Sequence, residues 1–395
     1  MTLSWPALDV PRGRPGAMRP TRAAVALVGA AAALALAGPA LAAGRASAAA
    51  AGSQRPPGFL SVQGQLVGVT TISPTDAWAT GDTTTLRDRP LLAHWDGRQW
   101  AVVKSPALPG RGQLYRVAKF PGGAFAVGFS GASDSVAQPL ILRLAGATAS
   151  RVPTPRVHGG QLLDVTATSA TSAWAVGQVF RGRALVLHWN GTAWRRTILP
   201  ARLGATVLGR VAATSAANAW AVGNTRSGRA QILHWNGRRW SRAAFPAPGG
   251  STLRLRGLTA TSAANAWAVG FTGGITDLAR TVTLHWDGRK WKRVPSQDPQ
   301  LGSEGDGFLG VSASSARRAW AVGGGFSGLD GAIMIERWNG SSWRAVPTPA
   351  SSGNLDGVSI GPSGPGWAVG QTLAASEAEG TQTLILRWDG TAWRA

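Results

Sequence analysis

The sequence predicts an all-β fold, a seven-bladed β-propeller made of four-stranded antiparallel blades. Three observations support this prediction. A tryptophan-containing repeat of about 48 residues occurs seven times, each repeat shows the apolar alternation of four short strands, and the chain is rich in turn-forming residues, with 53 Gly and 24 Pro. Short strands of this kind that recur at a fixed period are the pattern of propeller blades.

The repeat is centred on the pentapeptide Ala-Trp-Ala-Val-Gly, and its aromatic residue recurs at intervals of 46 to 53 residues. In six units a His/Arg-Trp-Asp/Asn-Gly sequence and a further tryptophan follow. Only Trp5 among the 19 tryptophans lies outside these three repeat positions, which excludes a chance pattern. The central aromatic residues of the seven units are Trp78, Phe125, Trp174, Trp220, Trp267, Trp320 and Trp367.

Each unit is predicted to contain four strands, because apolar residues alternate with small or polar ones. In the third unit the predicted strands are residues 163–168, 173–177, 184–189 and 193–197. No strand is exchanged between the first and last units, so we expect the ring to close by packing between blades one and seven. The predicted blades span residues 58–106, 111–155, 160–201, 205–249, 252–299, 306–349 and 353–395.

An Asp-Gly or Asn-Gly pair is predicted to form the turn between the third and fourth strands of six blades, because glycine tolerates the positive φ that a tight hairpin needs. In such a hairpin we expect Trp189 and Trp194 to lie diagonally on one face. The fixed spacing of the tryptophans favours packing between blades over sugar stacking. One further repeat position alternates between histidine and arginine, which favours a structural donor over a metal ligand: His94, His188, His234, His285, Arg143, Arg337 and Arg387.

The first 42 residues are predicted to be a signal peptide. Arg19 and Arg22 precede an apolar stretch, residues 23–41, and Ala42 completes a small-x-small cleavage site. An uncleaved membrane anchor is the alternative. Residues 43–57 are predicted to be a flexible linker. We therefore expect a secreted, extracellular protein that is cleaved near Ala42 and has no membrane association afterwards.

The absence of cysteine means that packing alone must hold the fold, and it excludes a thiol nucleophile. The formal net charge is +22, and subtracting the +3 of residues 1–42 (four Arg against one Asp) leaves +19. This charge predicts attraction to anionic polymers. Because arginine is spread over every repeat, we expect no specific nucleic-acid binding.

The two ends of the blades differ in their connections. The first-to-second and third-to-fourth turns have nearly constant length, whereas the connection from the second-strand glycine to the third-strand tryptophan position varies from 12 to 18 residues. Loops on a rigid scaffold usually carry binding, so the variable-loop face is predicted to be the ligand face, with neutral loop drift as the alternative. The candidate ligand-binding residues are Arg181, Arg183, Arg226, Arg229, Asp277, Arg280, Asp306 and Asp330.

The sequence offers little for catalysis. The only tyrosine is Tyr115, in the degenerate second unit, and there is no Gly-rich phosphate loop or nucleophile elbow. Carboxylates in the later loops, such as Asp298 and Asp306, lack the spacing of calcium ligands and are better explained as solvated loop residues. We predict no catalytic residue, no metal and no cofactor.

These motifs resemble those of bacterial secreted β-propeller repeat proteins of the tectonin, WD40 and Asp-box groups, over residues 59–395. Val-x-Ala-x-Ser at 211–215, Ala-Trp-Ala-Val-Gly at 219–223 and Ile-Leu-His-Trp-Asn-Gly at 232–237 are similar to tectonin repeats. Trp95-Asp96 resembles the end of a WD40 strand, but the Gly-His element is missing, and Asp-Gly-x-x-Trp resembles a shortened Asp box without its serine. The resemblance implies recognition of a surface polymer, and these departures allow no ligand residue to be transferred.

We therefore expect a monomeric, secreted and non-catalytic recognition module that binds glycans or anionic cell-wall polymers through the variable-loop face. Two alternatives stay open. One is an extracellular glycan-active hydrolase or lyase on a propeller scaffold, and the other is an interaction scaffold for another secreted protein.

Overall fold

The computed structural model describes residues 60, 62–83, 89–180, 182–204, 206–248, 252–273, 278–299, 301, 303–326, 331–350, 352–361, 365–372 and 381–395. The expected signal peptide (residues 1–42) and linker (residues 43–57) lie outside the described residues. The same is true of three candidate ligand residues, Arg181, Asp277 and Asp330.

The described residues form 28 strands and one short helix, α1 (Ala201–Gly204). The first strands of the blades are β1 (Gln65–Ser73), β5 (Gly112–Phe120), β9 (Gly160–Ser169), β13 (Thr206–Ser215), β17 (Leu253–Ser262), β21 (Asp306–Ser315) and β25 (Asn354–Ile360). The second strands are β2 (Asp76–Thr83), β6 (Gly123–Ser130), β10 (Ser172–Val179), β14 (Asn218–Thr225), β18 (Asn265–Thr272), β22 (Arg318–Gly325) and β26 (Gly366–Thr372). The third strands are β3 (Arg89–Trp95), β7 (Gln138–Ala145), β11 (Arg183–Trp189), β15 (Ala230–Trp235), β19 (Arg280–Trp286), β23 (Ile333–Trp338) and β27 (Gln382–Trp388). The fourth strands are β4 (Trp100–Val102), β8 (Thr148–Arg151), β12 (Trp194–Arg196), β16 (Trp240–Ala243), β20 (Trp291–Val294), β24 (Trp343–Ala345) and β28 (Trp393–Arg394).

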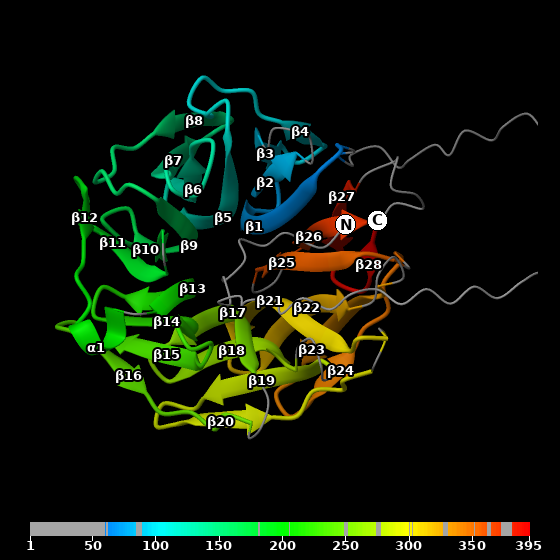
Figure 1. Cartoon of the computed structure of the whole chain (residues 1–395). Coiled ribbons are helices and arrows are strands. Elements are labelled where there is room, and N and C mark those ends of the chain that lie inside the picture. The colour runs from blue at the N-terminus through cyan, green and yellow to red at the C-terminus, as the bar shows by residue number, and fades with distance from the viewer. Residues whose placement is uncertain are drawn as a thin grey trace, which may run out of the picture. The chain divides into compact units, whose positions relative to one another are not determined.

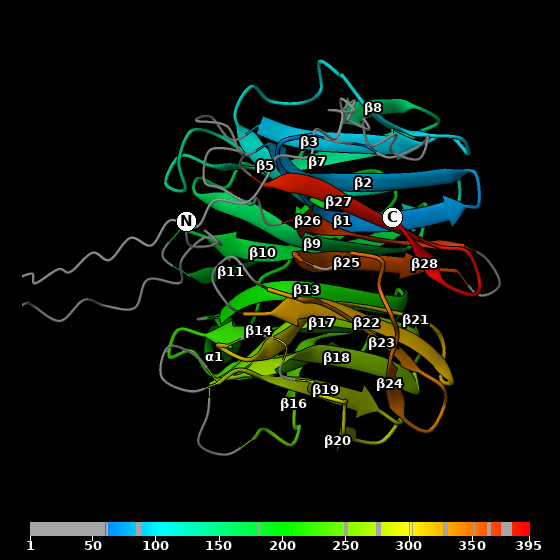
Figure 2. The same cartoon turned by 90° about the vertical axis from the view of Figure 1, so that its right-hand side faces the viewer.

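Each set of four consecutive strands forms one antiparallel sheet in chain order, so there are seven sheets. Figure 1 shows the sheets arranged radially, with the first strands nearest the centre and short fourth strands such as β16 and β20 at the rim. Figure 2 shows the same blades from the side. The predicted seven-bladed β-propeller is confirmed.

Every first strand contains a β-bulge, which bends the strand and redirects its side chains. The glycine that ends the pentapeptide repeat faces this bulge, and a Cβ added at Gly81 would collide with the carbonyl oxygen of Gln65. The repeat therefore needs glycine where the first two strands approach most closely. The bulges lie between Leu66 and Gly68, Leu114 and Arg116, Leu162 and Asp164, Leu208 and Arg210, Leu255 and Gly257, Phe308 and Gly310, and Leu355 and Gly357.

The hairpin between the third and fourth strands depends on both residues of the Asx-Gly pair. Gly191 has φ of 98°, and the Asn190 side-chain oxygen accepts hydrogen bonds from the N–H groups of Thr192 (3.1 Å) and Ala193 (2.9 Å). Trp189 and Trp194 are direct cross-strand partners, with ring centroids 5.7 Å apart. The expected diagonal arrangement is wrong because the turn spans four residues and leaves the two tryptophans opposite each other.

The tryptophans pack between blades, as their fixed spacing predicts. The second-strand ring of one blade contacts the third- and fourth-strand rings of the next blade. Trp174 of blade three, for example, lies 5.1 Å from Trp235 and 5.3 Å from Trp240 of blade four, between ring centroids. Phe125 takes the place of the second-strand tryptophan between blades two and three, and Leu144 packs with Trp78 between blades one and two.

In six blades the alternating His/Arg position stacks on the second-strand tryptophan of its own blade, and in blade two Arg143 lies over Phe120. The His234 ring lies 4.1 Å from the Trp220 ring, and its Nε2 is 2.8 Å from the side-chain oxygen of Asn218. In blade six, the Arg337 guanidinium lies 5.4 Å from the Trp320 ring centroid. Both residue types thus present a flat, polar group to the same aromatic face.

Hydrogen bonds contribute to ring closure, which the repeat pattern does not predict. Thr383 N–H donates to the Val62 carbonyl (3.0 Å), and Gly64 N–H donates to the Thr381 carbonyl (2.9 Å). The Thr383 hydroxyl also donates to the Leu60 carbonyl (3.2 Å) and accepts from Val62 N–H (3.2 Å). The segment before β1 therefore pairs with β27 of the last blade, and closure combines these bonds with packing. In the described residues no helix is long and apolar enough to cross a membrane.

Candidate functional site

A cavity of about 200 Å³ lies at the centre of the ring. All seven first strands contribute to its wall, from Gly68 of β1 to Val358 of β25. Its residues follow the strands from Asp164 to Thr166 and from Arg210 to Ala213. The cavity therefore extends from the bulges towards the hairpins that join the first and second strands.

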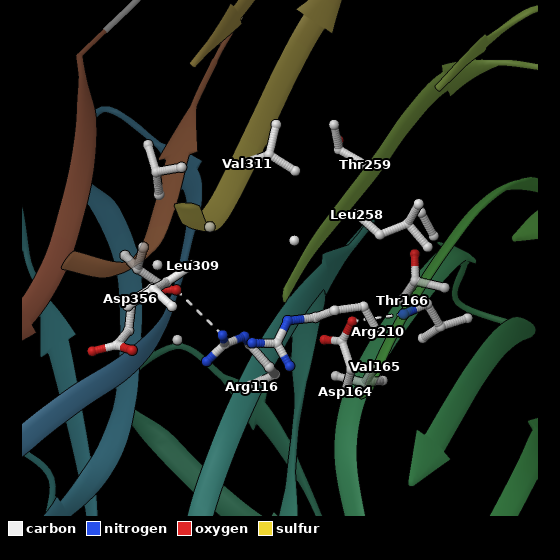
Figure 3. A pocket seen from close by; sticks show the side chains of 18 of the residues that line it. Arg116, Asp164, Val165, Thr166, Arg210, Leu258, Thr259, Leu309, Val311 and Asp356 are labelled. Atoms are coloured by element: carbon white, nitrogen blue, oxygen red, sulfur yellow. Dashed lines mark hydrogen bonds between the residues drawn. The ribbon is translucent and has the colours of Figure 1, made fainter. Parts of the chain in front are cut away.

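Charged side chains gather at the bulge end of this cavity (Figure 3). In three blades a charged residue directly precedes the valine at which the straight part of the first strand begins. These charged residues are Arg116, Asp164 and Arg210. Asp356 lies one position earlier, within the bulge of β25. The corresponding positions of the other blades carry glycine, at Gly68, Gly257, Gly310 and Gly357.

The glycines make room for close contact between neighbouring first strands. A Cβ added at Gly68 would lie 2.8 Å from the Tyr115 carbonyl oxygen, and one at Gly310 would lie 3.0 Å from the Asp356 carbonyl oxygen. The centre of the ring is thus narrow where glycine stands, and the charged side chains occupy the remaining space.

Arg116 connects three blades through carbonyl oxygens. Its Nη1 donates to the carbonyl oxygens of Val67 and Tyr115, the latter at 3.0 Å, and its Nη2 donates to the Asp356 carbonyl at 3.2 Å. These acceptors belong to β1, β5 and β25. The guanidinium is therefore fixed at the cavity and faces uncharged partners.

Arg210 is only 7% exposed, and its guanidinium points towards that of Arg116 in Figure 3. Its Nη1 donates to the Gly209 carbonyl (2.7 Å), whereas its Nη2 has no hydrogen-bond partner among the described residues. The neighbouring Asp164 uses Oδ2 to accept from Val211 N–H at 2.8 Å. Neither arginine forms an ion pair within 4.0 Å with a described carboxylate.

Burial shifts the pKa of every charged group in the cavity. It lowers the pKa of Arg116 and, together with repulsion from Arg116, lowers the pKa of Arg210 well below its ordinary value. Burial raises the pKa of Asp164, and it raises that of Asp356 to about 6. These shifts arise because water is largely excluded and the charges are not paired at contact distance.

A third arginine adds positive charge near this end. Arg256 occupies the bulge of β17, and its guanidinium lies 5.9 Å from the Phe271 ring centroid. Burial, with repulsion from Arg254, lowers the pKa of Arg256 to about 10. One buried arginine, Arg210, and the half-buried Arg116 and Arg256 thus stand against two buried aspartates, which gives the bulge end a positive excess.

Three predicted ligand residues are exposed at the variable-loop face. Arg183 begins β11, and Arg226 and Arg229 lie in the connection between β14 and β15. None of the three forms an ion pair with a described residue. Because these connections leave the same end of antiparallel sheets in adjacent blades, the structure places the three arginines on one face.

Two other predicted ligand residues have structural contacts. Arg280 is exposed at the start of β19, but its Nη1 pairs with Asp298 Oδ2 at 3.2 Å. Asp306 is fully buried at the start of β21, where Oδ1 accepts from Leu301 N–H at 2.8 Å. Asp306 therefore holds the entry into blade six and does not belong to the exposed ligand surface that we expected.

Glu336 is a fully buried carboxylate on β23 that the sequence pattern did not indicate as a functional residue. It accepts the N–H of Gln297, with Oε1 at 3.1 Å and Oε2 at 3.3 Å. Burial raises the pKa of Glu336 to about 7, and Asp298 and Asp306 add to the shift. The sequence signal for this buried carboxylate is that Glu336 occupies the third-strand position at which blade three has Leu187. In the described residues no group of three or more His, Asp or Glu side chains is placed to hold a metal ion.

The fold and the central cavity define a β-propeller scaffold. No family model matches the sequence, and no curated protein matches it. Among solved structures, the chain is similar to YCF48 bound to a D1 peptide, with TM-score 0.51 and 14% identity over 84% of this chain and 99% of that one. YCF48 from Cyanidioschyzon merolae gives TM-score 0.52 and 17% identity, covering 83% and 98%. A GH74 xyloglucanase from Xanthomonas campestris gives TM-score 0.56 and 14% identity, covering 85% and 56%. At these identities the likeness concerns the fold alone.

Proposed function

We propose that this protein is an extracellular, non-catalytic recognition propeller that binds an anionic polymer, such as an acidic glycan or a cell-wall polymer, on its variable-loop face. One observation carries the proposal. Arg183, Arg226 and Arg229 are exposed at the same end of adjacent blades and have no described carboxylate partner. Residues 1–42, with their signal-peptide pattern, support the extracellular location.

Charge repetition favours a polymer as the ligand. An exposed guanidinium gains little from one anion in water, because solvent and salt screen the attraction. Several guanidiniums on one rigid face can bind successive charges of a polyanion together, and Arg–carboxylate or Arg–phosphate contacts are geometrically favourable. The net charge of +19 that remains without residues 1–42 (+22 minus +3) adds long-range attraction to the same class of partner.

The test is retention of the secreted protein on immobilised acidic glycans, neutral glycans and cell-wall material at low and high salt. The proposal predicts retention on the anionic materials at low salt and release at high salt. Retention on neutral glycans that is insensitive to salt would contradict it. Capture of one defined secreted protein, with no polymer binding, would support the scaffold alternative.

A glycan-active enzyme is the second candidate, and one observation favours it. Asp164 and Asp356 both line the central cavity, and both have a raised pKa, as a general acid requires. We favour binding because Asp164 already accepts a backbone hydrogen bond from Val211. Turnover of a glycan that disappears in Asp164→Asn and Asp356→Asn would replace the non-catalytic proposal.

A further inference from the structure

The Arg210 guanidinium is buried and incompletely hydrogen-bonded. Its Nη2 has no partner among the described residues, although the side chain is only 7% exposed. In folded proteins most buried side-chain donors have a partner, and an ionised donor without one is costly. The Nη2 group of Arg210 can donate a hydrogen bond to an acceptor, and a negatively charged acceptor would form the strongest bond with it.

Arg116 places a second guanidinium beside that of Arg210. The two guanidiniums point towards each other across the bulge end of the cavity (Figure 3), and the charge of Arg116 contributes to the lowered pKa of Arg210. Neither Asp164 nor Asp356 lies within ion-pair distance of them. An oxyanion between the arginines would replace their mutual repulsion with two charge-assisted interactions.

The dimensions of the cavity limit the ligand. A volume of about 200 Å³ equals that of roughly six to seven water molecules, at ~30 Å³ each. This room suits one phosphate or carboxylate group with a few attached atoms. Away from the charges the wall includes Val165, Leu258 and Val311 together with Thr166 and Thr259, so the attached atoms would meet both apolar and polar groups.

We infer that the central cavity is a binding site for a compact oxyanion, a phosphate or carboxylate group, held by Arg210 and Arg116. The two arginines lie at the bulge end of the cavity, near the start of the first strands, and they line the cavity wall. The proposed polymer surface is a different set of residues, the exposed Arg183, Arg226 and Arg229, none of which lines the cavity. Phosphate and carboxylate share the acceptor geometry that a pair of guanidiniums recognises, and they differ in charge and in the number of oxygens.

Calorimetric titration of the full chain with inorganic phosphate, and separately with acetate, tests the inference. The wild-type protein is expected to bind at a single site, and the stronger of the two anions identifies the chemical class. Arg210→Gln should weaken that binding by about tenfold or more, since it removes a charged donor. Arg229→Gln, at an exposed residue outside the cavity, should leave anion binding unchanged while it weakens polymer retention.

Substitution of a buried arginine can disturb folding, so a second variant leaves both arginines in place. Thr259→Met adds volume to the cavity wall and should also abolish phosphate and acetate binding, while thermal unfolding followed by circular dichroism confirms the fold. The inference is overturned if neither anion binds the wild-type protein. It is equally overturned if Thr259→Met, or a folded Arg210→Gln protein, binds as the wild type does. Polymer binding that survives in Arg210→Gln separates this site from the proposed function.

Discussion

Trp367 of blade seven packs against Trp95 of blade one, with ring centroids 4.8 Å apart and ring planes at 58°. Trp100 meets the same Trp367 ring edge-on, at 5.1 Å and 81°. The three rings repeat the arrangement of Trp174, Trp235 and Trp240 between blades three and four. The contact that joins consecutive blades therefore also joins the last blade to the first.

Replacing Trp367 with alanine should lower the free energy of unfolding by about 3–5 kcal/mol, because a fully packed aromatic ring is lost and a cavity remains. Denaturant unfolding followed by circular dichroism measures the change. Ile198→Ala is the matched control, since Ile198 is 86% exposed and its loss should change stability by less than about 0.5 kcal/mol. Equal effects of the two substitutions would show that the tryptophan cluster does not hold the ring closed.

We expect the hydrogen bonds of the Thr383 hydroxyl to stabilise the pairing that closes the ring. Thr383→Val removes the hydroxyl that bonds both Leu60 and Val62, so amide exchange in residues 60–64 should accelerate about fivefold. Hydrogen–deuterium exchange mass spectrometry resolves this segment. The control is Thr372→Val, whose hydroxyl donates a long hydrogen bond of 3.5 Å to the Gln382 carbonyl, within the last blade. Unchanged exchange in Thr383→Val would mean that the hydroxyl does not help to hold the segment, which the backbone hydrogen bonds would then fix without it.

Glu336 should make stability depend on pH. Its pKa is about 7 in the folded protein and 4.5 in its ordinary state, so the folded protein binds the proton more readily than the unfolded chain. Its contribution to stability is therefore complete below about pH 4.5 and is lost as the pH rises towards 7. Between pH 5 and pH 8 the loss should be about 2 kcal/mol.

Glu336→Gln keeps an acceptor for Gln297 N–H and removes the titration, so the variant should lose less stability than the wild type between pH 5 and pH 8. Asp164 and Asp356 also have raised pKa values and titrate in the same direction, so the difference between variant and wild type is the diagnostic quantity. Unfolding free energies at the two pH values measure it. Parallel pH profiles would rule out the assignment to Glu336.

The blade pattern was predictable because its physical cause is local and repeated. A tryptophan at a fixed strand position fills the same gap between six of the seven pairs of neighbouring blades, with Phe125 in the seventh, and an Asx-Gly pair makes the same turn six times. The diagonal placement of Trp189 and Trp194 failed because register depends on turn length, which spacing alone does not determine.

The central cavity was not predicted, because ring closure brings together residues from distant blades. Arg116, Asp164 and Arg210 each replace a glycine of the other blades in an otherwise apolar strand. That substitution pattern was the available signal. Asp356 does not follow this pattern, because the position that corresponds to Arg116 in its blade is Gly357. Asp356 lies one residue earlier and reaches the cavity because of the β-bulge.

The candidate ligand residues of the variable-loop face share a charge and a position in a variable connection, and neither property determines whether a side chain is buried. Arg183 and Arg229 are exposed as expected. Asp306 is not, since it is fully buried at the entry to blade six and accepts the N–H of Leu301 there. That contact depends on the path of a non-repeating segment, about which the repeat pattern contains no information.

The affinity of a charge-reversed loop face for an anionic glycan tests the central claim most directly. The variant combines Arg183→Glu, Arg226→Glu and Arg229→Glu. The control makes the same change in charge on the opposite face, in hairpins between third and fourth strands, with Arg238→Glu, Arg239→Glu and Arg289→Glu. Binding of both variants and the wild type to immobilised polygalacturonate at low salt is expected to fall by about tenfold or more for the loop-face variant and much less for the control. Equal affinity of the loop-face variant and the wild type, or an equal loss in both variants, would contradict recognition by the variable-loop face.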